Sequence, residues 1–186
     1  MKKLFVICIA AVAAMCAASA QEDERMPGLY AVNGEESVRL TPVMSAQNNS
    51  STGILGVEIG KTIYKYKGET SDTKATGTFV LVCDMKKKVI KQTLKDYDVF
   101  IKTMTPDNII IIPLEVDKGR RIYDEGLLLD GIRTEVKGRA EFEWERISDN
   151  SFIIRTELAP GEYAIAFRPA RLGSFEFTAV FDFTVE

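Results

Sequence analysis

The sequence contains no histidine, and outside its first 20 residues it has a single cysteine, Cys83. A chain without histidine cannot form a Ser-His-Asp or Cys-His catalytic site, and it cannot bind a metal through imidazole. One thiol is too few for a thiolate zinc site or for a disulfide within the chain. The sequence therefore excludes these classes, and it predicts no cofactor and no metal. Because Cys83 follows apolar residues, we expect a small buried side chain rather than a reactive thiol.

Long apolar runs are also missing, except at the N-terminus. Residues 4–15 are apolar but too few to span a bilayer as a stable helix. Two lysines precede this run, and Ala18-Ser19-Ala20 follows it, which is the pattern of a secretory signal cleaved before Gln21. We therefore expect residues 1–20 to be a signal peptide and the protein to be exported, to the periplasm, the cell surface or the extracellular medium.

Cys16 offers an alternative fate for this segment, because a lipid attached to it would anchor the protein in a membrane. Bacterial lipoprotein signals have a small residue before the modified cysteine, and Met15 is large. We therefore favour cleavage before Gln21 over lipid attachment.

The expected mature chain, residues 21–186, is long enough for one domain with a sizeable core. It keeps 22 of the 24 basic residues and all 27 acidic residues, which gives a net charge of −5. A mildly acidic domain lacks the positive field that attracts nucleic acids and anionic membranes. We expect no nucleic-acid partner, and a membrane partner only if Cys16 is lipidated.

Period-two alternation of apolar and polar residues is the main positive signal, and it indicates half-buried β-strands. It is clearest at the C-terminus, where alternate side chains should point to opposite faces of a strand. The predicted apolar face comprises Phe175, Phe177, Ala179, Phe181, Phe183 and Val185, and the predicted solvent face comprises Glu176, Thr178, Val180, Asp182, Thr184 and Glu186.

The same signal predicts strands elsewhere. Residues 140–145 and 152–155 should form a hairpin, because the residues between them have turn chemistry. A second hairpin is expected between residues 97–102 and 108–116; residues 109–112 should be central in a sheet, and Pro113 should end or bulge the pairing. Further strands are expected at residues 29–32, 38–42, 54–59, 62–67, 78–83 and 163–167.

Residues 45–53 and 69–76 are polar and are predicted to be exposed loops. Residues 86–96 allow two interpretations, because their apolar residues are spaced for one face of a short helix and a strand fits nearly as well. Roughly ten or more short strands separated by turns predict an all-β fold, an antiparallel β-sandwich. The pattern leaves a jelly-roll and an immunoglobulin-like topology both open.

Three turn-and-strand motifs stand out in the expected mature chain. They are Met26-Pro27-Gly28-Leu29-Tyr30, Gly119-Arg120-Arg121 and Leu158-Ala159-Pro160-Gly161-Glu162-Tyr163. Together they resemble small exported β-sandwich proteins of uncharacterised function from Gram-negative bacteria of the Bacteroides type. The resemblance implies an exported location and a β-fold, and it implies no activity.

Glu141, Glu143 and Glu145 share one face of a predicted strand, where neighbours lie about 6.5–7 Å apart. That spacing approaches the separation of the two acids in inverting glycosidases. Glycosidases bring their acids from opposite sides of a cleft, so we favour a solvated strand face. In a hydrolase, one of these residues would act with a loop acid such as Asp130.

Aromatic residues offer candidate ligand faces. Trp144 is the only tryptophan and could stack on a sugar, but its alternation with Phe142 places it in the core. Tyr64 and Tyr66 share one face of a predicted strand, which could bind a glycan or pack in the core; we favour the core.

Charged residues are the remaining candidates. Arg120 and Arg121 could join a ligand face, but ion pairing with neighbouring acids explains them as well. Lys86-Lys87-Lys88 could dock an anionic partner, although a solvated turn is the simpler interpretation. No calcium site is predicted, because the spacing of a calcium loop is not found in Asp117, Asp124, Glu125 and Asp130.

Three functions remain, and we favour the first. It is a non-catalytic binding or adhesion module that presents loops or a sheet face to a glycan or a partner protein. The second is an accessory structural subunit of an envelope assembly, which would pair with another chain through a sheet edge. The third is a carboxylate-dependent glycoside hydrolase.

Overall fold

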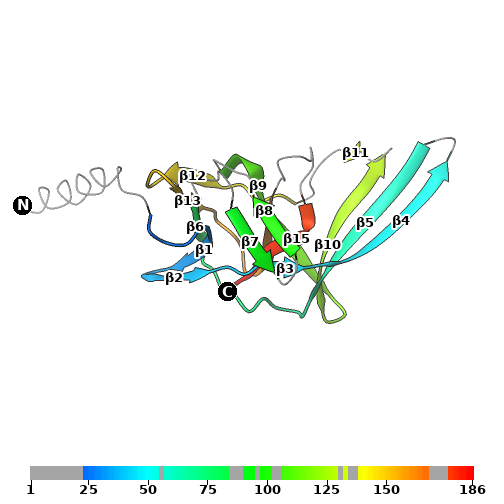
Figure 1. Ribbon diagram of the computed structural model, residues 1–186. Coiled ribbons are helices and arrows are strands. Elements are labelled where there is room, and N and C mark those ends of the chain that lie inside the picture. The colour runs from blue at the N-terminus through cyan, green and yellow to red at the C-terminus, as the bar shows by residue number, and fades with distance from the viewer. Residues whose placement is uncertain are drawn as a thin grey trace, which may run out of the picture.

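A computed structural model describes residues 23–54, 57–83, 90–94, 97–101, 106–129, 132–133, 138–167 and 176–186. The predicted signal peptide, Cys16, Lys86-Lys87-Lys88 and Asp130 lie outside the described residues. The described chain is built from β-strands, which confirms the predicted all-β sandwich class (Figure 1).

The elements are β1 (Gly28–Asn33), β2 (Glu36–Arg39), β3 (Val43–Met44), β4 (Ala46–Ile54), β5 (Val57–Lys67), β6 (Thr78–Val82), β7 (Ile90–Leu94), β8 (Tyr97–Ile101), the 3-10 turn η1 (Pro106–Asn108), β9 (Ile109–Asp117), β10 (Arg120–Leu129), β11 (Ile132–Arg133), β12 (Glu143–Arg146), β13 (Ser151–Arg155), β14 (Gly161–Phe167) and β15 (Glu176–Val185).

Two antiparallel sheets form the layers of the sandwich. A five-stranded sheet has the order β12-β13-β6-β1-β2, and an eight-stranded sheet has the order β3-β15-β14-β9-β10-β5-β4, with β11 paired to β10. β7 and β8 form a separate hairpin. In Figure 1 the five-stranded sheet lies toward the N-terminus, and β4, β5 and β10 extend away from it on the opposite side.

The eight-stranded sheet curls strongly because its two edge strands are consecutive in the chain. β3 pairs with β15 at one edge, and β4 pairs with β5 at the other. Only Ser45 separates β3 from β4, so the two edges must come together at this point. The sheet therefore encloses an interior of its own, called here the curled interior, in addition to the face that it turns toward the five-stranded sheet.

The core between the two sheets is apolar, as expected for inward faces of a sandwich. Ile109 and Ile111 of β9 point into it, whereas Ile110 and Ile112 point into the curled interior. β9 lies between β14 and β10, which confirms the prediction that this isoleucine run is central. The buried residues of the intersheet core are Leu29, Ala31, Leu40, Ala75, Phe79, Leu81, Cys83, Ile109, Ile111, Phe152, Ile154, Ile165, Phe167, Phe181, Phe183 and Val185.

The curled interior is more polar and more aromatic. Tyr64, Tyr123 and Phe177 contact one another, with ring centroids between 4.7 and 6.5 Å apart. The hydroxyl of Tyr66 donates a hydrogen bond of 2.7 Å to the backbone carbonyl of Phe177, which lies on the facing strand β15. Tyrosine can fill such an interior because its ring packs while its hydroxyl finds a buried acceptor.

The C-terminal strand departs from its predicted faces. Val180 and Asp182, predicted to meet solvent, are buried, because β15 turns one face to the intersheet core and the other to the curled interior. The register between β14 and β15 is irregular after Ile165↔Phe181, and beyond this point Phe177 faces the curled interior, whereas Phe181 faces the intersheet core. A local irregularity of this kind changes which side of a strand a residue faces.

Residues 45–53, predicted to be a loop, belong mainly to β4, so that prediction was wrong. β4 pairs with β5 from Ala46↔Lys65 to Ile54↔Val57. The predicted strand over residues 54–59 is consequently divided, with its first residue ending β4 and its last three beginning β5. A strand made of Asn, Ser and Thr lacks the apolar alternation on which the prediction depended.

The short helix considered for residues 86–96 is also not found where this segment is described. Residues 90–94 form β7 and not a helix, because they pair along their length with β8; the rest of residues 86–96 lies outside the described residues. The predicted hairpin between β8 and β9 was wrong as well, since β8 pairs with β7, and β9 pairs with β10 and β14. Pro113 does not end β9, which continues to Asp117.

The hairpin between β12 and β13 is confirmed, with Glu143 opposite Arg155 and Arg146 opposite Phe152. Trp144, however, is not a core residue, because β12 is the outermost strand of its sheet and all four of its residues are exposed. The tryptophan is 39% exposed and contacts Phe152 edge to face.

The first described residues are tied to the five-stranded sheet. The backbone amide of Asp23 donates to Oδ1 of Asn150 at 2.7 Å, and Nδ2 of Asn150 donates to the carbonyl of Asp23 at 3.0 Å. Arg25 pairs with Asp23, and its guanidinium lies 5.1 Å from the centre of the Tyr30 ring. The chain that follows the predicted cleavage site is thus held against the outer face of this sheet.

Candidate functional site

The loop between β5 and β6, residues 68–77, crosses from the eight-stranded sheet to the five-stranded sheet and is called here the crossover loop. The amide of Ala75 donates to the carbonyl of Thr184 on β15 at 3.0 Å. Nδ2 of Asn33, at the end of β1, donates to the carbonyl of Lys74 at 2.9 Å. The loop is thus hydrogen-bonded to both sheets and closes one end of the sandwich.

Gly77 ends the crossover loop in a conformation that requires glycine. Its φ is +89°, and a Cβ at this position would lie 2.3 Å from the carbonyl oxygen of Thr156. The amide of Thr156 donates to the carbonyl of Gly77 at 2.9 Å, so the two backbones must approach closely. This contact fixes where the loop enters β6.

A groove of about 470 Å³ lies where the crossover loop meets the ends of β1 and β15. Ala75, Leu158 and Val185 provide its apolar surface, and polar groups surround them. Lys74 and Glu186 form an exposed ion pair at its rim. The polar lining residues are Asn33, Lys74, Thr76, Thr184 and Glu186. Ligand pockets usually measure about 300–1,000 Å³ and combine apolar walls with a few placed polar groups, so this groove has the size and composition of a binding site.

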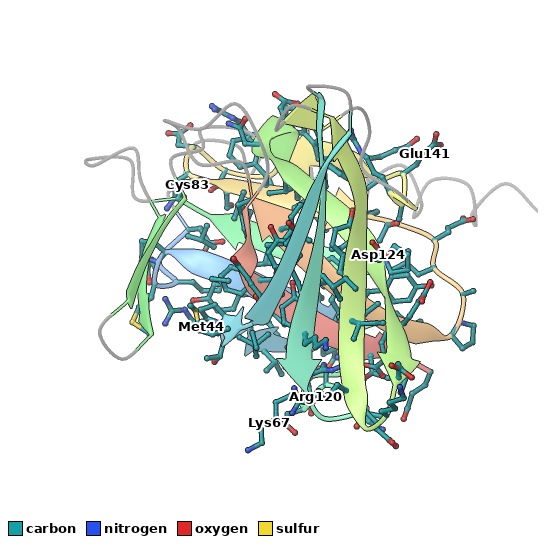
Figure 2. All side chains as sticks on the ribbon, turned by 90° about the vertical axis from the view of Figure 1, so that its right-hand side faces the viewer. Met44, Lys67, Cys83, Arg120, Asp124 and Glu141 are labelled. Carbon is teal, nitrogen blue, oxygen red and sulfur yellow. The ribbon has the colours of Figure 1, made fainter. Side chains whose placement is uncertain are left out.

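A buried cluster of charged side chains lies behind the groove, at the end of the curled interior. Arg121 of β10 is 3% exposed, and Glu162 of β14 and Asp182 of β15 are also buried. Nη1 of Arg121 forms an ion pair with Oδ2 of Asp182 and lies 3.6 Å from Oε2 of Glu162. Its Nη2 donates to the carbonyl of Lys67 at 2.8 Å. Figure 2 shows Lys67 together with Arg120 at this end of β5 and β10.

The crossover loop closes this cluster from above. The amide of Ser71 donates to Oε2 of Glu162 at 3.0 Å, and its hydroxyl donates to Oδ1 of Asp182 at 3.2 Å. The hydroxyl of Thr184 donates to Oε1 of Glu162 at 2.7 Å. Two buried carboxylates thus share one arginine and three neutral donors, which offsets much of the cost of burying charge. Among the described residues, Nε of Arg121 has no hydrogen-bond partner.

Burial raises the pKa of Asp182 above its ordinary value, while the charge of Arg121 and the hydrogen bond from Ser71 act in the opposite direction. Two carboxylates facing one guanidinium would carry a net negative charge in a poorly solvated place, and protonating one of them relieves it. Because loop and strand donors hold both acids, neither presents a carboxylate to the groove.

Thr184 connects the buried cluster to the groove. Its hydroxyl contacts Glu162 on the inner side, and the residue lines the groove on the outer side. Its backbone is held by the crossover loop, since its amide donates to the carbonyl of Thr73 at 2.8 Å. The cluster therefore fixes the wall of the groove and takes no direct part in its surface.

The structure separates the two predicted arginine candidates. Successive residues of a strand point to opposite sides, so Arg120 is exposed and Arg121 is buried. The expected local ion pairing was wrong for Arg121, whose partners are on β14 and β15, far along the chain. Two of the motifs that suggested the family resemblance meet in this cluster. The motif of residues 119–121 supplies Arg121, and the motif of residues 158–163 supplies Glu162.

The aromatic candidates do not form a ligand face. Tyr64 and Tyr66 are buried in the curled interior, as the favoured core interpretation expected. Trp144 is exposed, but on β12, which supplies no lining residue of the groove. A single exposed ring on an edge strand is a weak basis for a sugar site, because its companion Phe152 is buried beneath it.

The glutamate row lies on the surface. Glu141, Glu143 and Glu145 are exposed, as the solvated-face interpretation expected, and Glu145 forms an exposed ion pair of 3.6 Å with Arg155. Figure 2 shows Glu141 at the periphery of the molecule. Their proposed companion, Asp130, lies outside the described residues.

Cys83 is a buried side chain of the intersheet core, as expected. Burial raises the pKa of its thiol to about 11. A thiol with so high a pKa is almost wholly protonated at neutral pH, and the thiolate is the reactive form. Cys83 therefore acts here as a small apolar residue.

Sequence reasoning missed Asp182, Ser71, Thr184 and the groove. One signal was available, because Asp182 interrupts an otherwise apolar stretch of β15 and a buried charge needs a partner. The crossover loop gave no such signal, since its composition is that of any polar loop.

Within the described ranges, no group of three or more acidic or cysteine side chains is placed to hold a metal ion. No helix in this part of the chain has the length and hydropathy needed to cross a membrane.

The fold and the groove define an all-β sandwich with a binding-site-sized depression at one end. Comparison with known proteins adds no relative: no protein family matches this chain, and no curated protein or solved structure is similar to it.

Proposed function

We propose that this chain is an exported, non-catalytic binding module, and that the groove beside the crossover loop is where it holds its ligand. The observation that carries the proposal is the groove of about 470 Å³, with an apolar floor and a rim of paired charge and amide and hydroxyl groups. The ligand is a short segment of a glycan or of a partner protein.

The charge of the rim supports a polar ligand without strong net charge. Lys74 and Glu186 neutralise each other at the rim. Asn33 and Thr76 are hydrogen-bonded to each other and to the backbone of Lys74 and Val32, and an amide and a hydroxyl each keep capacity for a further hydrogen bond. Groups of this kind satisfy hydroxyls of a sugar or the backbone of an extended peptide. The apolar floor would contact a sugar face or a small side chain.

The buried cluster supports binding rather than hydrolysis. A general acid must reach the reacting atom by a hydrogen bond or through one water. Glu162 and Asp182 are instead held by Ser71, Thr184 and Arg121 behind the wall of the groove. A turnover assay on any ligand found would separate binding from catalysis.

The test is the melting temperature of residues 21–186 against a panel of neutral and acidic oligosaccharides and short peptides. A ligand at a hundredfold excess over Kd adds about 2.7 kcal/mol of stability, which is a rise of several degrees for a domain of this size. Thr76→Trp fills the groove and should abolish the rise, whereas Asp149→Trp, an exposed substitution in the β12–β13 turn, should leave it unchanged.

Either of two results would count against this function. A ligand that stabilises Thr76→Trp as much as the native chain binds elsewhere. A panel that leaves the native melting temperature unchanged removes both ligand classes.

A further inference from the structure

Acidic residues flank the groove where β1 turns into β2. Asn33, which lines the groove, pairs directly with Glu36. Directly opposed residues of an antiparallel pair place their side chains on the same face of the sheet, so Glu36 shares the face of Asn33. Glu35 lies in the turn between them, and both glutamates are exposed. This side of the groove therefore carries two carboxylates.

Two more acids accompany other walls of the groove. Glu157 directly precedes Leu158 of the apolar floor, and Asp72 lies two residues before Lys74 of the rim. Both acids are exposed. Their Cα atoms lie about 3.8 Å and at most about 7 Å, respectively, from those of the two lining residues, which is within the screening length of about 8 Å at physiological salt. A ligand in the groove therefore experiences their charge.

The charge of these four acids is not balanced within the part of the chain that the structure describes. Lys74 is the one basic residue that lines the groove, and it already pairs with Glu186. Arg155, the cation nearest to Glu157 in sequence, pairs with Glu145. Within the same ranges none of the four acids forms an ion pair. Four negative charges thus surround a groove whose rim is neutral.

The floor of the groove suits an aliphatic side chain better than a sugar. Ala75, Leu158 and Val185 form it, and no aromatic residue is among the described residues that line the groove. A flat aromatic ring, the surface on which a sugar face would stack, is thus missing from the floor. Small and branched apolar side chains instead form a surface on which a leucine or valine of a peptide can be buried.

We propose that the groove binds an extended, basic segment of a partner protein, with one aliphatic side chain on the floor and lysine or arginine residues on both sides of it. The proposal rests on the proposed function and names the partner of the same groove. Successive side chains of an extended segment point to opposite sides, so the residues beside the buried one are free to turn outward. Lysine and arginine are long enough to reach the surrounding carboxylates, with which they form charge-assisted hydrogen bonds.

Fluorescence anisotropy of labelled peptides with residues 21–186 tests the partner class. Three end-blocked peptides share a central leucine and differ in the residues that flank it, which are lysine, serine or glutamate. The lysine peptide should bind about tenfold more tightly than the serine peptide, since each exposed ion pair contributes modestly and several act together. The glutamate peptide should bind most weakly. The differences should largely disappear at about 1 M salt, where the screening length is about 3 Å.

Charge reversal beside the groove provides the matched comparison. Glu36→Lys and Glu157→Lys should each weaken the lysine peptide by about fivefold and strengthen the glutamate peptide, because a nearby attraction becomes a repulsion. Asp149→Lys makes the same change of charge at an exposed acid that precedes β13, whereas Glu157 follows that strand. It should leave the affinity for all three peptides unchanged.

A lysine peptide whose central leucine is replaced by glycine tests the floor, and it should bind more weakly than its parent. Thr76→Trp, which fills the groove, should abolish binding of the parent peptide. If Asp149→Lys weakens the lysine peptide as much as Glu36→Lys and Glu157→Lys do, the attraction is only the diffuse charge of an acidic domain, and the inference is overturned. Undiminished binding to Thr76→Trp would overturn it as well.

Failure of this inference is distinguishable from failure of the proposed function. If the lysine peptide binds no better than the other two, while an oligosaccharide raises the melting temperature of the native chain but not of Thr76→Trp, the groove is a binding site for a glycan. The inference about the partner then falls and the binding function stands. If neither a peptide nor an oligosaccharide binds, both fall together.

Discussion

The two interiors of this molecule share strands β9, β14 and β15 but differ in chemistry. The intersheet core is apolar, and Phe79, Phe181 and Phe183 are fully buried in it. The curled interior contains three buried tyrosines and ends in the cluster of Arg121, Glu162 and Asp182. β9 faces both, since its successive isoleucines alternate between them.

The difference follows from how each interior is closed. The intersheet core has another sheet to cover it, and apolar burial at about 25 cal/mol per Å² suffices. The curled interior opens at one end and is closed by the crossover loop, whose backbone amides and hydroxyl need acceptors. Glu162 and Asp182 provide them, and Arg121 balances their charge. The closed end then supports the wall of the groove.

Arg121→Met should have the largest effect and should separate the two interiors most clearly. It leaves two carboxylates buried without a cation, and breaking a buried ion pair in this way costs about 3–5 kcal/mol. Chemical denaturation would measure the loss.

The companion variant replaces the whole cluster, Arg121→Met with Glu162→Leu and Asp182→Leu. It should recover part of that stability, since a buried ion cluster exchanged for apolar groups is often near neutral. If the triple variant is no more stable than the single one, uncompensated charge is not the cause of the loss.

Tyr66→Phe should cost about 0.5–1.5 kcal/mol, because it removes the buried hydrogen bond from the Tyr66 hydroxyl to the carbonyl of Phe177. Phe183→Tyr in the intersheet core offers the opposite change, a hydroxyl brought into an apolar site. Equilibrium unfolding of both variants would show whether the hydroxyl stabilises one interior and destabilises the other. A Tyr66→Phe variant as stable as the native chain would contradict this account.

Ile111→Val and Ile112→Val test whether the interiors differ in packing as well as in polarity. Both residues are fully buried, and they face opposite interiors. Each substitution should cost about 0.5–1.5 kcal/mol, and the two costs should agree within a few tenths of a kcal/mol. If one substitution costs clearly more stability than the other, the interior with the smaller cost is the more loosely packed, because its surroundings can close the cavity.

The smallest effect we expect concerns pH. Because the folded pKa of Asp182 is raised by burial, the folded state binds its proton first, and this group adds stability as the pH falls through that pKa. Asp182→Asn lacks this gain, so the free energy of unfolding of the native chain should rise relative to that of the variant as the pH falls.

Asp23 provides the contrast to Asp182. Its pKa is lowered, chiefly by the hydrogen bond from Arg25, so its contribution is present above the ordinary pKa and is lost as the pH falls. Asp23→Asn should therefore show the opposite trend in the same series of denaturation curves. If stability changes with pH in the same direction for both variants, burial does not raise the pKa of Asp182.

The sequence predicted the parts of the fold that depend on local alternation. The β12–β13 hairpin, the central position of residues 109–112 and the buried Tyr64 and Tyr66 followed from apolar spacing. β4 was missed because a strand of Asn, Ser and Thr has no apolar face to reveal it.

The remaining errors come from contacts between distant segments. Arg121 has acidic neighbours in sequence, yet its partners are Glu162 and Asp182, which only the curl of the eight-stranded sheet brings together. Trp144 alternates as a core residue would, yet it is exposed because β12 is an edge strand. Neither the strand order nor the groove could be derived from alternation within one strand.

The central claim is that the closed end of the curled interior supports a ligand groove. The most direct measurement is NMR of residues 21–186 titrated with the oligosaccharide or peptide that most raises the melting temperature. The account predicts that the largest amide shifts fall at Asn33, Ala75, Thr76 and Val185, around the groove. Shifts centred on Trp144 and the edge strand β12 would contradict it, and would place the ligand on the five-stranded sheet.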